Sequence, residues 1–138
     1  MNMAQITEDY ISFETAKLLK EKGFDEETPV NYFVGDDKPR GCVVGEIIHH
    51  KRAEEDTHLI ACPTLWMAMK WLREVHNIHI SVEMGFDVDN RQYFFFAPSI
   101  CKFSNKTGEY QTPFGEKEFD TYEEACEAAI KYCLENLL

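Results

Sequence analysis

The sequence predicts an α+β domain with a mainly antiparallel sheet of four or five strands and three helices, at least two of them packed on one face. The expected elements follow the order helix, strand, strand, helix, strand, strand, helix. Residues 78–86 alternate apolar and polar side chains, which indicates a strand with one buried face, whereas a covered parallel sheet would show continuous apolar runs. Because 138 residues is the length of one domain, we expect a single unit over residues 1–138.

The first helix is expected to begin at Thr7 or Ser12 and to end at Lys22. Gly23 follows it, and glycine is common where a helix ends in a left-handed residue. Residues 1–5 show no apolar pattern, so we expect them to be disordered.

The next segments indicate β structure less strongly. Residues 30–34 are rich in β-branched and aromatic side chains, and residues 42–50 form a second strand candidate. The two can pair as a hairpin. Residues 51–56 are polar and are expected to be the most mobile internal segment, and residues 59–61 are expected to lead into the central helix.

The central helix is expected over residues 63–76. Pro63 suits the first turn, where a missing amide proton costs nothing, and Asn77 can take the left-handed conformation that stops a helix. Trp66 lies on the polar side between Lys70 and Arg73, where a cation over the indole ring contributes about 0.5–1 kcal/mol. The apolar residues cover an arc of roughly 200°, wider than a half-exposed helix needs. They are Leu65, Met67, Ala68, Met69, Trp71, Leu72 and Val75.

A hairpin is expected after this helix. The alternating strand at residues 78–86 is followed by a turn at 87–90 and an aromatic strand at 92–97. Pro98 interrupts the pattern, so residues 100–103 are expected either to continue the strand past a bulge or to form an edge segment.

The last helix begins with a capping-box pattern. In this pattern the Thr121 hydroxyl accepts a hydrogen bond from the third backbone N–H of the helix, and the Glu124 carboxylate accepts one from the backbone N–H of Thr121. Cys126 and Cys133 are seven residues apart on its apolar face, where cysteine acts as a small hydrophobic residue.

Composition restricts the partners and the compartment. The net charge of −11 argues against binding nucleic acid, which needs clustered basic residues, and favours a basic partner. Apolar runs are far shorter than the ~18–20 residues that span a bilayer, so we expect no membrane association. Five cysteines without a C-x-x-C motif fit a reducing compartment, and we expect a cytoplasmic protein.

The sequence gives only a weak indication of a metal site or of a catalytic group. His49, His50, His58 and Cys62 are residue types that can bind zinc. However, His49 and His50 would point to opposite faces of a strand, so this group is better explained as polar surface. Cys62 could alternatively act as a nucleophile with His58 as its base. We favour a structural role for Cys62.

Acidic clusters and general motifs also indicate no chemistry. Asp36 with Asp37, and Asp87 with Asp89 and Asn90, are better explained as turn residues than as a cation site. Phosphate-binding, dinucleotide-binding and common hydrolase motifs are absent from the sequence. We therefore expect no catalytic residue, no metal and no cofactor.

Three blocks of the sequence resemble a family of small uncharacterised proteins from gut anaerobic bacteria and their phages and integrated mobile elements. The blocks are residues 12–24 (SFETAKLLKEKGF), 63–78 (PTLWMAMKWLREVHNI) and 121–137 (TYEEACEAAIKYCLENL), about a third of the chain. The resemblance implies a bacterial cytoplasmic protein of mobile-element origin and implies no activity or site residue.

Two classes of function are consistent with the sequence. The first is a non-enzymatic interaction or accessory protein that binds a protein partner or self-associates, most simply as a two-fold homodimer. The width of the apolar arc makes the central helix the interface candidate, through Trp66, Met67, Met69 and Trp71.

The alternative is a small enzyme or ligand-binding domain with a pocket between the central helix and the aromatic strand. A deep pocket with convergent polar groups would favour this alternative, and a flat apolar patch would favour an interaction protein. The polar groups expected in such a pocket are His79, Glu83 and Tyr93.

Overall fold

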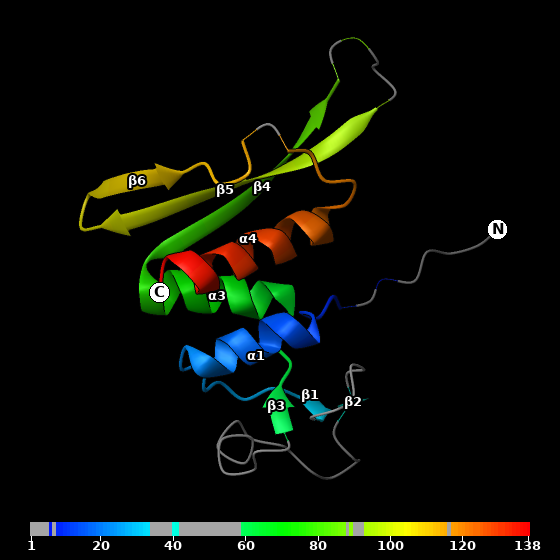
Figure 1. Cartoon of the computed structure of the whole chain (residues 1–138), viewed down its shortest axis with the longest axis vertical. Helices are drawn as coiled ribbons and strands as arrows, with labels where there is room; N and C mark the ends of the chain where they lie inside the picture. Colours follow the sequence, from blue (N-terminus) through cyan, green and yellow to red (C-terminus); the bar gives the residue numbers. More distant parts are fainter. Residues whose placement is uncertain are drawn as a thin grey trace, which may run out of the picture.

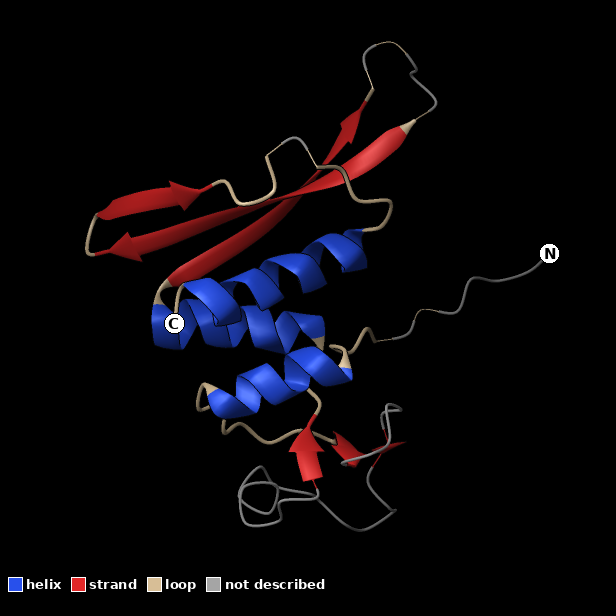
Figure 2. Cartoon of the chain, viewed as in Figure 1, coloured by secondary structure: helices blue, strands red, loops and turns tan. Residues whose placement is uncertain are grey.

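A computed structural model of the chain describes Ile6 and residues 8–33, 40–41, 59–87, 89, 93–115 and 117–138. These residues form helices and strands in an α+β arrangement, which confirms the predicted class (Figures 1 and 2). The elements are α1 (Phe13–Glu21), β1 (Val30–Phe33), β2 (Arg40–Gly41), β3 (Leu59–Ala61), α3 (Leu65–His76), β4 (Ile78–Phe86), β5 (Phe94–Ser104), β6 (Thr107–Gln111) and α4 (Tyr122–Asn136).

The described strands pair antiparallel, as predicted, but they form two separate sheets in place of one sheet of four or five strands. One sheet has the order β2-β1-β3 and the other has the order β4-β5-β6. Figure 1 shows the helices between the two sheets, with α4 and α3 beside β4 and β5 and with α1 nearer to the small sheet. The helices keep the two groups of strands apart, because apolar helix side chains are buried on both sides of the helical layer.

The small sheet is built around β1. Tyr32 of this strand pairs with Ile60 of β3, so the segment expected only to lead into the central helix is itself a strand. β1 also pairs with β2. The predicted partner strand at residues 42–50 and the mobile segment predicted at 51–56 lie outside the described residues, as does the disorder predicted at 1–5.

The helix starts follow hydroxyl caps. Ser12 caps α1, with its Oγ accepting from the Thr15 N–H at 3.2 Å, which selects the later of the two predicted starts. The predicted start of α3 at Pro63 was wrong, because Thr64 is the cap and its Oγ1 accepts from the Met67 N–H at 3.1 Å. A hydroxyl that pairs with a free amide of the first turn fixes the start more strongly than proline does.

The predicted end of α3 and start of α4 are confirmed. Asn77 has φ 56° and ψ 40°, the left-handed conformation that ends the helix, and β4 begins at the next residue. At the start of α4, the Thr121 Oγ1 accepts from the Glu124 N–H at 3.1 Å, as the capping-box pattern predicts.

β5 runs through Pro98 without a bulge, which corrects the prediction of an interruption. The register against β4 is continuous and places Val82 opposite Pro98. Phe96 exchanges both backbone hydrogen bonds with Phe119, so its N–H points away from β4. Pro98, two residues later, has its nitrogen on the same side, and the β4–β5 ladder therefore loses no hydrogen bond.

One core cluster joins the elements of both sheets and all three described helices. Cys126 and Cys133 lie fully buried within it, as their spacing on the helix predicts. In the described part of the chain, no helix has both the length and the apolar character needed to cross a membrane.

Candidate interaction surfaces

A groove of about 660 Å³ runs along α3 and is closed on one side by the acidic segment at residues 25–27. Its α3 wall contains three of the four residues predicted as interface candidates. These candidates are Trp66, Met67 and Trp71. Lys70, Glu74 and Val75 also line this wall but were not predicted as interface residues.

Trp66 is the exposed aromatic side chain of this groove, with 62% of its surface accessible. The Lys70 Nζ lies 5.1 Å from the centre of its ring, so the cation contact expected from the sequence is present. Val75 is also exposed, although the helical wheel places it in the apolar arc. The apolar surface of α3 is therefore not fully covered by described residues.

Trp71 and Met69 contribute less than Trp66 to the exposed wall of this groove. Trp71 is only 6% exposed, and its ring makes edge contacts with Phe24 at 5.5 Å and His76 at 4.5 Å between centres. Met69 is partly buried against the core and does not line the groove. Trp66 is therefore the exposed residue of the predicted interface, and half-buried Met67 and buried Trp71 line the same groove.

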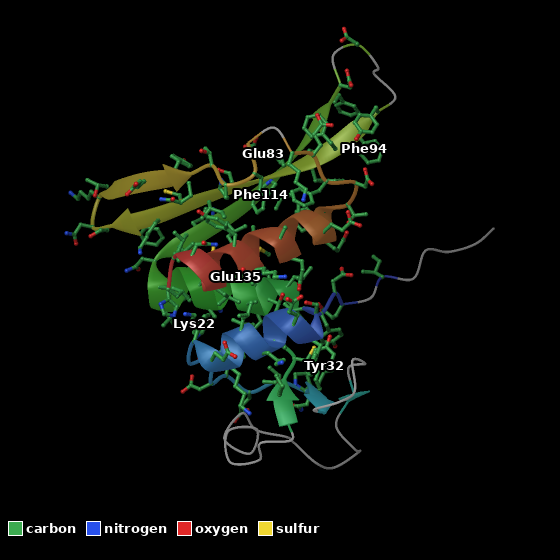
Figure 3. All side chains as sticks on the ribbon, in the orientation of Figure 1. Lys22, Tyr32, Glu83, Phe94, Phe114 and Glu135 are labelled. Carbon is green, nitrogen blue, oxygen red and sulfur yellow. The ribbon has the colours of Figure 1, made fainter. Side chains whose placement is uncertain are left out.

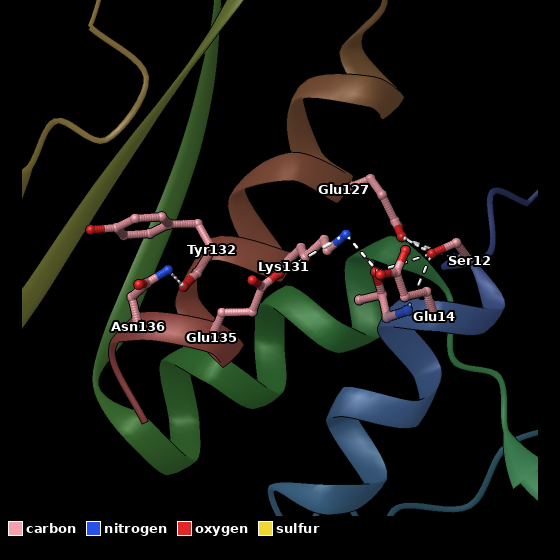
Figure 4. Close-up of polar contacts among 8 residues, drawn as sticks. Ser12, Glu14, Glu127, Lys131, Tyr132, Glu135 and Asn136 are labelled. Carbon is pink, nitrogen blue, oxygen red and sulfur yellow. Dashed lines mark hydrogen bonds and ion pairs between the residues drawn. The ribbon is translucent and has the colours of Figure 1, made fainter.

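A second groove of about 630 Å³ lies between α4 and residues 9–12, which lead into α1. The Glu127 Oε1 accepts hydrogen bonds there from the Ser12 N–H at 3.0 Å and the Ser12 Oγ at 2.6 Å (Figure 4). The Lys131 Nζ reaches the Glu14 Oε1 at 3.1 Å. Because Glu127 and Lys131 already bind Ser12 and Glu14 across this junction, the groove is best explained as a structural contact between the start of α1 and α4.

The large sheet carries an apolar surface that the sequence did not predict. In the β4–β5 register, even-numbered residues share the face on which Ile78, Ile80 and Ile100 are buried against the helices. Further along the hairpin, the same face is exposed. We call this the aromatic hairpin surface and define it as Met84, Phe86, Phe94, Phe96 and Tyr122.

The aromatic rings of this surface form a continuous row. Neighbouring ring centres are 6.5 Å apart from Phe86 to Phe94, 6.0 Å from Phe94 to Phe96 and 6.2 Å from Phe96 to Tyr122. The exposed fractions are 55% for Met84, 56% for Phe86, 49% for Phe94 and 44% for Tyr122. Figure 3 shows Phe94 on the part of the hairpin that extends away from the helices.

Acidic groups lie near the same end of the hairpin. Glu83 is exposed, and its position between Val82 and Met84 puts it on the opposite face of the sheet. The pKa of the Tyr93 phenol is raised, first by partial burial and then by the carboxylates of Glu118 and Asp120. The hairpin end therefore combines one apolar face with nearby negative charge.

The described residues that were considered as a nucleophile or as cation ligands have structural roles. Burial raises the pKa of the Cys62 thiol to about 11, the opposite of what a nucleophile needs. The Asp87 Oδ1 accepts from the Asp89 N–H at 2.8 Å, which is the turn contact predicted there. Among the described residues, no group of three or more histidine, cysteine, aspartate or glutamate side chains is arranged to hold a metal. The remaining candidates, His49, His50, His58, Asp36, Asp37 and Asn90, lie outside the described residues.

Sequence reasoning missed the aromatic hairpin surface for a definite reason. Alternation in residues 78–86 predicts one apolar face but not how far along the strand the helices cover it. The signal that could have found it is the length of the hairpin, because a nine-residue strand spans about 30 Å. α4 begins at Tyr122 beside Phe96, so its first turn marks where the cover ends.

Comparison of the chain with protein-family models, with curated proteins and with solved structures finds no match.

Proposed function

We propose that this chain is a non-enzymatic interaction protein that binds a protein partner through the aromatic hairpin surface. The observation that carries the proposal is the exposure of Met84, Phe86 and Phe94 on the face of the sheet that forms the core elsewhere. Scattered exposed apolar side chains are ordinary, but a contiguous row of rings with acidic residues nearby is typical of a protein interface.

The geometry gives less support to an enzyme or ligand-binding domain. Neither groove described above lies between α3 and β5, and neither is lined by the polar groups expected of such a pocket. His79 and Glu83 are exposed on the face of the sheet away from the helices. They are four residues apart along β4, about 13 Å, and neither lines a groove described above, which favours the interaction role.

The proposal includes the setting that the sequence suggests. The resemblance of the three sequence blocks supports an accessory role in a phage or mobile element. The unpaired thiols of Cys62, Cys101, Cys126 and Cys133 are consistent with a reducing compartment, and we place the protein in the cytoplasm.

Site-specific photocrosslinking tests the proposed surface. A photoreactive phenylalanine analogue is placed at Phe94 in the full chain, and crosslinking is done in the cell of origin. We expect one discrete conjugate, whose partner is then purified and titrated against the wild type and Phe94→Ser. Loss of one half-buried aromatic anchor should weaken binding by about 1–3 kcal/mol.

The matched control is the same analogue at Tyr110. This side chain is more exposed than Phe94 but lies on β6, outside the aromatic hairpin surface. The proposal fails if both positions give the same conjugates, or if Phe94→Ser binds the purified partner as tightly as the wild type.

A further inference from the structure

β4 is an edge strand with an open side. It lies at the end of the order β4-β5-β6, and no other described strand pairs with it. Its nine residues, Ile78–Phe86, pair with β5 along their whole length, so β4 is held in a regular extended form.

The hydrogen-bonding groups of the open side can be assigned from the ladder. The Phe96 N–H donates to Phe119, away from β4, and Phe96 is the partner of Met84. In an antiparallel pair, opposite residues point their backbone groups to each other or both outward. Met84 therefore directs its N–H and C=O to the open edge, and so do Val82 and Phe86 at two-residue spacing.

Apart from one charged residue, Glu83, the edge lacks the features that normally prevent pairing with another strand. β4 contains no proline and no lysine or arginine, and its register shows no bulge. Glu83 is its one charged residue, and exposed strand edges are usually protected by at least one such feature. An edge left open beside exposed Met84 and Phe86 is suited to accept a further strand.

The two faces of the hairpin specify the chemistry of that strand. A strand paired with β4 places alternate side chains on each face. Those opposite Val82, Met84 and Phe86 would continue the aromatic hairpin surface, and apolar side chains fit there. Those opposite Glu83 would lie on the other face, where basic side chains fit an exposed carboxylate on a chain of net charge −11.

We propose that β4 binds an extended segment of a partner protein, with alternating apolar and basic residues, as a fourth strand of the β4–β5–β6 sheet. This inference rests on the proposed interaction function and specifies how the partner binds. The backbone groups of Val82, Met84 and Phe86 supply the hydrogen bonds, and the aromatic hairpin surface supplies the apolar contact.

The Met84→Pro variant separates backbone pairing from side-chain contact. Because the Met84 N–H faces outward, proline there removes no hydrogen bond of the β4–β5 ladder, as with Pro98 in β5. Met84→Ala is the matched control, since it also loses the side chain but keeps the N–H. Circular dichroism and the urea midpoint of both variants establish that each is folded.

The probe is a short synthetic peptide of alternating lysine and valine, titrated by fluorescence anisotropy. Valines opposite Val82, Met84 and Phe86 direct their amides at β4. N-methylation of the valine amides should therefore weaken binding at least about tenfold. Replacing lysine with glutamate in the peptide should weaken it similarly. Met84→Pro should bind the unmodified peptide about tenfold more weakly than Met84→Ala does.

Several results would overturn strand addition. The first is that the lysine–valine peptide does not bind the wild type. The second is that the N-methylated peptide binds as tightly as the unmodified peptide. The third is that Met84→Pro and Met84→Ala bind the unmodified peptide with equal affinity. A wild-type dimer that Met84→Pro abolishes would show that a second copy is the occupant, which also overturns the proposal.

Failure of this inference and failure of the proposed function give different results. If a partner crosslinked at Phe94 binds Met84→Pro as tightly as Met84→Ala, strand addition is wrong and the interaction function stands. If Phe94 gives no conjugate beyond the Tyr110 control, the proposed function itself fails, whatever the peptide does.

Discussion

Burial decides the chemistry of individual cysteines in this protein. The pKa is raised to about 11 for Cys62 and Cys126 and to about 12 for Cys133, with loss of solvation as the main cause. At about pH 8, a thiol of pKa about 11 is ionised in only about one molecule in a thousand. These three side chains therefore behave as apolar core residues.

Thiol labelling checks this prediction. At about pH 8 in native buffer, we expect an aromatic disulfide reagent to leave Cys62, Cys126 and Cys133 unmodified, whereas all five cysteines should react in denaturant. Rapid native labelling of Cys62, located by peptide mapping, would contradict its burial and revive the nucleophile alternative.

The same thiols also make stability fall at high pH. Their folded pKa values lie above the ordinary value of 9.0, so the unfolded chain ionises first and the folded chain holds more protons from about pH 9 up to about pH 11 for Cys62 and Cys126, and up to about pH 12 for Cys133. Their contribution is present below about pH 9 and is lost as the pH rises through the folded pKa.

At the scale of elements, the sequence predicts what local chemistry controls. Helix α3 ends where Asn77 takes its left-handed conformation, and α4 starts at the Thr121 cap. The separation into two sheets depends on contacts between distant segments, such as Tyr32 with Ile60. A pattern read along the chain contains no such information.

The exposure of the candidate interaction residues could also be predicted only in part from a pattern along the chain. Trp66 was identified as exposed because a helical wheel places it among polar residues, and the structure agrees. The alternation over residues 78–86 assigns Phe86 to the face that was expected to be buried, but the helices do not reach it and Phe86 is exposed. Periodicity gives the face of an element, whereas exposure depends on the extent of the neighbouring layer.

The junction of α1 and α4 supports a further prediction. The Glu127 carboxylate accepts from the N–H and Oγ of Ser12 at the positive end of α1. Glu127→Ala should lower the free energy of unfolding by about 1 kcal/mol, because an exposed cap contact is lost. Urea denaturation followed by circular dichroism measures this change.

Glu135→Ala is the control for that measurement. Glu135 also lies on α4, but its carboxylate reaches Lys131 only at 4.0 Å. A surface pair of this kind contributes little, so a loss below about 0.5 kcal/mol is expected. Equal losses in the two variants would show that the Ser12 contact adds nothing specific.

At the scale of the whole molecule, the α3 surface and the net charge act in opposite directions. Exposed Trp66 and Val75 beside the groove favour the two-fold homodimer suggested by the wide apolar arc. Two chains of net charge −11 repel each other, and this repulsion is screened by salt. We therefore propose that self-association through α3 is weak at low ionic strength and becomes stronger as salt is added.

Sedimentation at micromolar concentration measures this balance. We expect the dimer fraction to rise between about 0.01 M and 1 M salt, as the screening length falls from about 30 Å to 3 Å. Trp66→Ala should weaken the dimer by about 1–3 kcal/mol if the ring anchors the contact. Tyr110→Ala is the control, since this exposed side chain lies on β6. A single species of 16.1 kDa at every salt concentration, unchanged on dilution, would exclude the dimer and assign Trp66 to covering its own helix.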